Sequence, residues 1–180
     1  MDIKTLCLGV LSRGDATGYE IKKAFEEGPF GHIHVASFGA IYPALHLLSQ
    51  DGMVVGTEMA QEKRPDKKVF SITDRGRQAL FEALMAPPDE DKVRSDFLFI
   101  MFFAQMLPAS RLAALVDQRI AWYRACLERM ESCGCTEGPP GEQFVHGLGL
   151  AVYRAAAEYL TANRDRLLDE VSAQTRLVAE

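Results

Sequence analysis

The chain has 180 residues, 48% of them hydrophobic and 25% charged, which is typical of a globular protein with one domain or two small ones. The longest apolar run, Phe97 to Leu107, is about half a membrane-spanning helix, and the N-terminus lacks the layout of a signal peptide. A soluble, cytoplasmic protein that does not interact with membranes is predicted, and its net charge of −5 neither supports nor excludes nucleic-acid binding.

The charge is unevenly distributed along the chain. Residues 1–86 carry a net charge of −1, whereas residues 87–180 carry −4, and every lysine except Lys92 lies in the first part. Any interaction with nucleic acid must therefore depend on local patches rather than on the overall field.

The first two predicted elements are short helices. Apolar residues recur at spacings of three and four over residues 3–11, which predicts a helix there. Thr17 precedes Glu20 by three residues, the spacing of a capping box, and predicts a second helix from that point to about Glu27.

A third helix is predicted between Ser37, a favourable N-cap, and Gly52, which can end a helix in the left-handed conformation. At 100° per residue its apolar face contains Phe38, Ile41, Leu45 and Leu48. Its opposite stripe contains Gly39, Pro43, His46 and Gln50, with Tyr42 at the edge. Because Pro43 would interrupt one backbone hydrogen bond, we expect a helix that starts early and bends locally.

Residues 53–59 and 67–73 are rich in Val, Ile, Phe and Thr and predict two strands, with residues 60–66 as the hairpin tip. Thr73 is the expected N-cap of a fourth helix over residues 74–85. The Pro-rich acidic segment at residues 86–91 then predicts a domain boundary, with domains at 1–86 and 87–180.

The second domain is predicted to be helical throughout. Residues 94–107 are apolar nearly all round, so we expect this helix to be buried on most sides. Helices are also expected over residues 109–132 and from about 142 to 177. The fold class is therefore mainly α with a small β-hairpin wing: an N-terminal winged helix-turn-helix followed by a C-terminal helical dimerisation domain.

In such a fold the third helix would enter the major groove of double-stranded DNA. Gly39 would permit close approach of the backbone, Tyr42 would donate to a phosphate, and His46 would bond a base edge or a phosphate. Ser37, at the start of the helix, joins this predicted set. The alternatives are a packing role for Tyr42 at the edge of the core and a surface role for His46.

The positive charge is predicted on the wing, where Lys63, Arg64, Lys67 and Lys68 lie within six residues and only Asp66 opposes them. Each such cation that meets a phosphate releases counterions and adds sequence-independent affinity. Lys4 is a further candidate for a flanking backbone contact. The alternative is that the tip is simply a solvated charged loop.

Neither a cofactor, a metal nor an enzymatic activity is predicted, because the sequence contains no phosphate-binding loop, nucleophile elbow or zincin motif. His32 and His34 have a spacing that permits a shared metal, but no further ligand completes a set. Cys126, Cys133 and Cys135 suit a thiol sensor only if a thiolate is stabilised, and a structural role is the simpler interpretation.

Three segments together resemble the PadR family of transcriptional regulators: LCLGVLSRGDATGYEIKKAFE, SFGAIYPALHLLSQDGMV and KKVFSITDRGRQAL. The resemblance covers the first half of the chain and implies a homodimeric DNA-binding regulator, usually a repressor. It implies that two winged helices bind an inverted repeat, with Tyr42 in the recognition helix and residues 63–68 in the wing. Leu47 stands where many relatives have Arg, so a phosphate contact from that position is not expected.

The resemblance also implies that a small aromatic or hydrophobic effector releases the DNA. Trp122 and Tyr123 are the candidate residues for its pocket, with a core or interface role as the alternative. A different class of function remains open, in which the chain is a helical protein-interaction module whose winged helix no longer binds DNA. The acidic charge and the uncharged third helix favour that alternative, and the basic wing opposes it.

Overall fold

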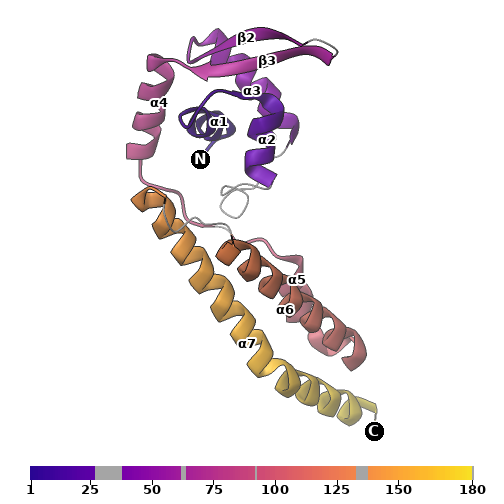
Figure 1. Ribbon diagram of the computed structural model, residues 1–180. Coiled ribbons are helices and arrows are strands. Elements are labelled where there is room, and N and C mark those ends of the chain that lie inside the picture. Colours follow the sequence, from indigo (N-terminus) through magenta and orange to yellow (C-terminus); the bar gives the residue numbers. More distant parts are fainter. Residues whose placement is uncertain (27–37, 62–63, 92, 133–137, 180) are drawn as a thin grey trace. The chain divides into compact units, whose positions relative to one another are not determined.

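The computed structural model describes residues 1–26, 38–61, 64–91, 93–132 and 138–179 (Figure 1). The chain divides into two compact units, Met1–Asp91 and Lys92–Glu180, and each has its own buried core. The boundary predicted after residue 86 lies five residues before this division.

In its described residues, the first unit combines four helices with a small sheet. Its elements are α1 (Ile3–Leu11), β1 (Ala16–Thr17), α2 (Gly18–Glu26), α3 (Phe38–Gln50), β2 (Val54–Gln61), β3 (Arg64–Ile72) and α4 (Asp74–Met85). The predicted mainly helical fold with a hairpin wing is confirmed.

The sheet has three antiparallel strands in the order β1-β3-β2. Strand β1 was not predicted, because two residues are too few to show an alternating pattern. Its pairing with β3, Thr17 opposite Val69, attaches the base of the wing to the segment that precedes α2.

The predicted extent of the hairpin tip, residues 60–66, is wrong. Strand β2 continues to Gln61 and β3 already begins at Arg64, so the hairpin strands are longer than predicted. Pro65 lies on β3 beyond Val69 and Phe70, the residues that pair with β1. On that side β3 has no neighbouring strand, so a residue without a backbone N–H is tolerated there.

The core of this unit is formed by the inward faces of the first three helices, and the base of the wing closes it. The predicted inward residues of α3 that are described, Ile41, Leu45 and Leu48, are all at most 1% exposed. They pack with residues of α1 and α2 and with Val54 and Phe70 of the sheet. Burying this apolar surface fixes which face of α3 points outward.

Both ends of the connection between α3 and α4 follow the predicted caps. Gly52 has φ +68°, and the N–H of Met53 donates to the carbonyl of Leu48 at 2.8 Å, which ends α3. Thr73 caps α4 by accepting from the N–H of Gly76 at 3.1 Å, and its hydroxyl donates to the carbonyl of Gly52 at 2.8 Å. Helix α3 begins at Phe38 and includes Pro43, so the early start is confirmed, whereas Ser37 lies outside the described residues.

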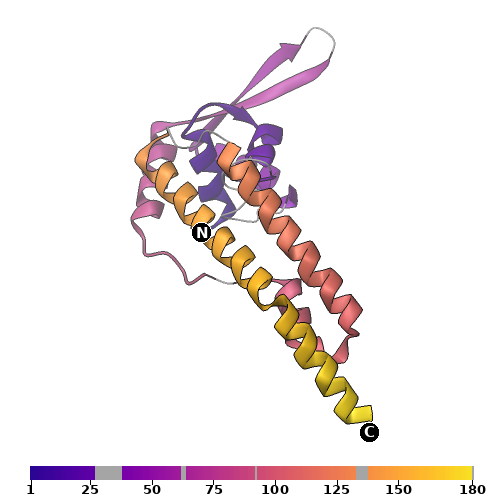
Figure 2. The same ribbon diagram turned by 60° about the horizontal axis from the view of Figure 1, so that its bottom comes forward.

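The second unit contains α5 (Asp96–Phe102), the 3-10 turn η1 (Ala104–Met106), α6 (Ala109–Ser132) and α7 (Pro140–Ala179). Helices α6 and α7 lie side by side (Figure 2). Leu112, Val116 and Ile120 form the buried face of α6. They pack against α5, η1 and the C-terminal half of α7.

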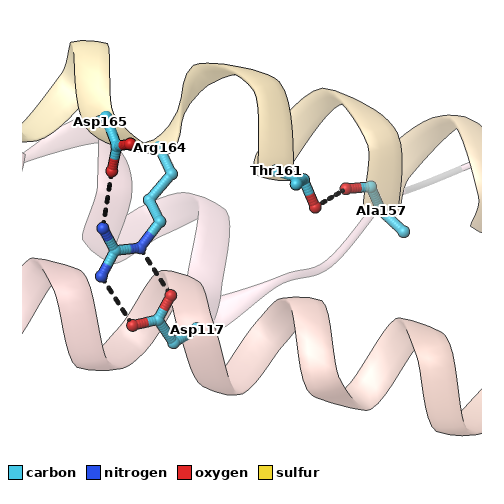
Figure 3. Close-up of polar contacts among 5 residues, drawn as sticks. All are labelled: Asp117, Ala157, Thr161, Arg164 and Asp165. Atoms are coloured by element: carbon cyan, nitrogen blue, oxygen red, sulfur yellow. Dashed lines mark hydrogen bonds and ion pairs between the residues drawn. The ribbon is translucent and has the colours of Figure 1, made fainter.

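A polar contact joins α6 to α7 on the surface (Figure 3). The Arg164 guanidinium donates to both carboxylate oxygens of Asp117, at 2.6 and 2.8 Å, and to Asp165 at 2.7 Å. This pairing lowers the pKa of Asp117 and raises the pKa of Arg164. The bidentate geometry fixes the register of the two helices more than it adds to stability, because the pair is solvated.

The prediction that residues 94–107 form one helix buried on most sides is wrong for the single chain. Helix α5 ends at Phe102, and a separate turn follows. Phe97 and Ala104 are buried, but Phe99, Phe102 and Met106 are 69%, 79% and 75% exposed. Within one chain, α6 and α7 cover one side of this segment only.

Candidate nucleic-acid interface

The outward stripe of α3 lies on the surface as its helical positions predicted. Tyr42 is 61% exposed, and Gly39, Pro43 and His46 are exposed as well. A Cβ added at Gly39 would meet nothing within 4 Å, so the backbone there is open to close approach from outside. This surface is uncharged, because residues 38–50 contain neither Lys nor Arg.

The Tyr42 ring lies directly against the backbone of Gly18, the first residue of α2. A Cβ built on Gly18 would stand 2.6 Å from Cε1 and 2.8 Å from Cζ of Tyr42, too close for any real side chain. The absence of a side chain at Gly18 therefore allows the ring to lie across the start of α2. Tyr42 therefore packs against Gly18 while most of its surface stays exposed, and its predicted contact with phosphate stays a prediction.

The start of α2 is organised by the carboxylate of Glu20. Its Oε2 accepts from the N–H of Thr17 at 2.7 Å and from the Thr17 hydroxyl at 2.8 Å, and the Thr17 hydroxyl accepts from the N–H of Glu20 at 3.1 Å. The predicted capping box is confirmed. The second oxygen of Glu20, Oε1, accepts from Nζ of Lys67 on the wing at 3.0 Å.

These donors stabilise the ionised form of Glu20. Hydrogen bonds from Thr17 are the main cause, followed by the Lys67 ammonium, and together they lower the pKa of Glu20 to about 2. Sequence reasoning found the cap, which spans three residues, but missed the contact with Lys67, which spans 47. No sequence signal beyond opposite charge pointed to it.

The two wing lysines that are described in full lie on opposite sides of β3, because successive residues of a strand alternate. Lys67 is partly buried and paired with Glu20. Lys68 is exposed and lies opposite Glu58 of β2 in the strand register, with its Nζ 5.7 Å from the centre of the Phe70 ring. A Cβ at Gly56 would stand 2.6 Å from Cε of Lys68, so the stem of this lysine crosses the glycine.

The other predicted cations are placed only in part. Lys63 lies outside the described residues, and Arg64 is described by its backbone position at the start of β3. Lys4 lies in the first turn of α1, partly exposed and near Asp2, whose carboxylate accepts from the N–H of Thr5 at 2.9 Å. Of the basic set predicted at the tip, Arg64, Lys67 and Lys68 lie along β3.

The two residues predicted for an effector pocket are in contact in the second unit. The rings of Trp122 and Tyr123 have centroids 5.0 Å apart, and both contact Tyr153 of α7, at 5.6 and 5.5 Å. The Arg119 guanidinium lies 5.2 Å from the Trp122 ring. Burial is the main cause that raises the pKa of the Tyr153 hydroxyl.

Among the residues that the structure describes, no group of three or more His, Cys, Asp or Glu side chains could hold a metal ion. His32, His34, Cys133 and Cys135 lie outside those residues. Cys126 is buried on α6, and its sulfur accepts a hydrogen bond from Arg129 at 3.1 Å. In the described part of the chain, no helix is both long and apolar enough to span a membrane.

The model of the "Transcriptional regulator PadR-like family" matches residues 7–82, which include α2, α3 and the whole wing. This part of the chain is similar to the PadR-like family of transcriptional regulators, as the sequence resemblance predicted. Because this family consists of non-enzymatic DNA-binding regulators, the prediction of a PadR-like regulator rather than an enzyme is confirmed.

The negative transcriptional regulator PadR of Bacillus subtilis is 27% identical over 130 residues, which are 72% of this chain and 71% of that protein. The PadR-like regulator BC1756 of Bacillus cereus is 29% identical, with a TM-score of 0.79 over 91% of this chain and 94% of that one.

The fold is shared with B. subtilis PadR in complex with operator DNA, at a TM-score of 0.74 and 23% identity over 91% and 98% of the two chains. It is also shared with that protein in complex with p-coumaric acid, at a TM-score of 0.67 and 22% identity over 92% and 98%.

Proposed function

We propose that this PadR-family regulator is a homodimeric repressor that binds an inverted-repeat operator through α3 and the wing of each protomer. The observation that carries the proposal is the exposed stripe of Gly39, Tyr42 and His46 on a helix whose other face is buried. The B. subtilis relative is named a negative regulator and has been solved with operator DNA, which supports the same role here.

An uncharged recognition helix suits this role if α3 provides the fit to the DNA groove while the wing provides the electrostatic affinity for phosphates. On α3, the open backbone at Gly39 allows close approach, and Tyr42 and His46 supply hydrogen-bonding groups for phosphates or base edges. On the wing, exposed Lys68 supplies positive charge, and Arg64, Lys63 and Lys4 are proposed to add to it. Two protomers would double each contribution.

The homodimer is supported by apolar side chains that the single chain leaves uncovered. In α5 and η1 these are Leu98, Phe99, Phe102 and Met106, and on α7 they are Phe144, Leu148, Val152 and Tyr159. All are more than half exposed, and large exposed apolar surfaces mark interfaces. A second copy of the chain would bury them.

A small aromatic or hydrophobic effector is proposed to release the DNA. The support is the cluster of Trp122, Tyr123 and Tyr153, together with the B. subtilis relative solved with p-coumaric acid. Since Trp122 is the single tryptophan of the chain, its fluorescence reports any ligand that enters the cluster. A panel of aromatic acids that neither quenched Trp122 nor lowered DNA affinity would remove this part of the proposal.

DNA binding is tested by fluorescence anisotropy with a duplex from the region upstream of the protein's own coding sequence and a random duplex of equal length. We expect affinity for the upstream duplex to exceed affinity for the random one and to fall steeply as salt rises. Absence of both effects would refute the proposal. That outcome would favour the alternative function, a protein-interaction module, which the lack of cations on α3 also supports.

A further inference from the structure

The position where α2, β1 and β3 meet is occupied by one carboxylate. Glu20 uses Oε2 for the N–H and hydroxyl of Thr17 and Oε1 for the ammonium of Lys67. Thr17 belongs to β1, and Lys67 belongs to the wing, so a single side chain joins the start of α2 to both.

The site of this contact matters for the wing. Strand β1 pairs with β3 at Val69 and Phe70 only, so the ladder that attaches the wing to the helices ends there. Lys67 lies two residues further toward the tip and on the same side of the strand as Val69. The contact between Lys67 and Glu20 therefore extends the attachment beyond the last backbone pair.

A short attachment has a large effect at the far end of a strand. From Val69 to Arg64 the strand spans about 17 Å, so a tilt of about 10° at its base would move Arg64 by about 3 Å. A displacement of that size exceeds the distance range of a hydrogen bond to a phosphate. The base of the wing thus controls where the outer cations lie.

The adjacent lysine has a different environment. Lys68 is exposed on the other side of the strand, and its stem crosses Gly56. The Lys68 ammonium can therefore contact a phosphate while the ion pair between Lys67 and Glu20 stays intact. For Lys67, a phosphate would have to replace a carboxylate that is already within 3.0 Å.

We propose that Glu20 is a positioning residue for DNA binding: it holds the wing through Lys67, while Lys68 rather than Lys67 contacts phosphate. This inference rests on the proposed DNA-binding function. It assigns different roles to two neighbouring lysines that composition alone treats as one basic patch.

Four variants of the full-length chain separate these roles. Glu20→Gln retains a side-chain acceptor for the cap but removes the charge that holds Lys67. Lys67→Met removes the other partner, and Lys68→Ala removes the proposed phosphate contact. Glu58→Gln is the matched control, since it removes a carboxylate from the wing opposite Lys68 without touching the contact between Glu20 and Lys67. Thermal unfolding by circular dichroism verifies that each variant is folded.

The measurement is the affinity for the upstream duplex and for the random duplex over a range of salt concentrations. For Glu20→Gln and Lys67→Met we expect the ratio of the two affinities to fall about two- to fivefold, the range of a partly exposed ion pair. A double variant that combines Glu20→Gln with Lys67→Met should reduce this ratio no more than either single variant does. The salt slope is the slope of the logarithm of the affinity against the logarithm of the salt concentration. Lys67→Met should leave this slope unchanged, whereas Lys68→Ala should reduce its magnitude by about 0.9 per bound protomer. Glu58→Gln should change both affinities alike.

Two results would overturn the inference while leaving the proposed function intact. One is a salt slope that falls as much for Lys67→Met as for Lys68→Ala; the other is a ratio that Glu20→Gln leaves at the wild-type value. A wild-type chain that prefers neither duplex and shows no salt dependence would instead overturn the proposed function, and this inference with it.

Discussion

Replacing Gly18 by Ala should weaken DNA binding without unfolding the protein. The added Cβ would stand 2.6 Å from Cε1 of Tyr42, whereas carbon atoms in contact lie about 3.5 to 4.0 Å apart, so the ring must move by about 1 Å. Because the Tyr42 side chain is 61% exposed, it can move toward solvent, and we expect the free energy of unfolding to change by less than about 1 kcal/mol.

The same displacement has a larger effect on a bound phosphate. A hydroxyl donates to a phosphate oxygen over about 2.6 Å, and a further 1 Å removes that hydrogen bond. Hydrogen bonds to charged groups contribute about 1.5 to 3 kcal/mol, so affinity for the upstream duplex should fall at least about tenfold.

Anisotropy titrations of Gly18→Ala, Tyr42→Phe and the double variant measure this effect. The double variant should bind as weakly as Tyr42→Phe, because the group that Gly18→Ala displaces is then already gone. Gly9→Ala is the matched control, since a Cβ there meets nothing within 4 Å. Wild-type affinity for Gly18→Ala, or losses that add in the double variant, would refute the reasoning.

Three further predictions concern stability and reactivity. Gly76→Ala should lower the free energy of unfolding by about 1 to 3 kcal/mol in urea titrations, because the added Cβ overlaps the backbone carbonyl of Met53; an unchanged midpoint would contradict this. The pKa of Glu20 is lowered in the folded state, to about 2, so its contribution to stability is present above pH 4.5 and is lost as the pH falls toward 2. The difference in unfolding free energy between wild type and Glu20→Gln should therefore shrink over that range, by about 1 kcal/mol after screening by solvent; a constant difference would exclude the linkage. Burial raises the pKa of Cys7 to about 12, so alkylation at pH 8 followed by peptide mapping should find Cys7 modified only after unfolding, and rapid labelling of the native protein would show that the core opens.

The sequence predicted those elements whose stabilising interactions are local. The capping box of Thr17 and Glu20 and the Thr73 cap each span three residues, and the structure contains both. The buried face of α3 follows from its helical period, as does the helix over Ala109–Ser132. The outward stripe of the candidate site was therefore predictable as well, since it lies opposite a buried face.

Other features depend on residues that are distant in sequence. Strand β1 is too short to show a period, and only its pairing with β3 defines it. Strand β3 also begins at Arg64 and includes Pro65, which was predicted to lie in the hairpin tip. For residues 94–107 the composition indicated burial on most sides. The buried fraction depends on which helices pack against this segment, and within one chain α6 and α7 cover one side of it.

By itself, then, the sequence determined the order of the main helices and the two hairpin strands, the caps at Thr17, Gly52 and Thr73, and the inward face of α3, because short-range hydrogen bonds and hydrophobic periodicity act within a few residues. Only the tertiary structure decided that Tyr42 lies on Gly18 and that Lys67 pairs with Glu20 while Lys68 stays exposed. These contacts arise where α2, α3 and β3 meet. Packing of the shared core brings together Gly18 and Tyr42, which are 24 positions apart, and Glu20 and Lys67, which are 47 positions apart.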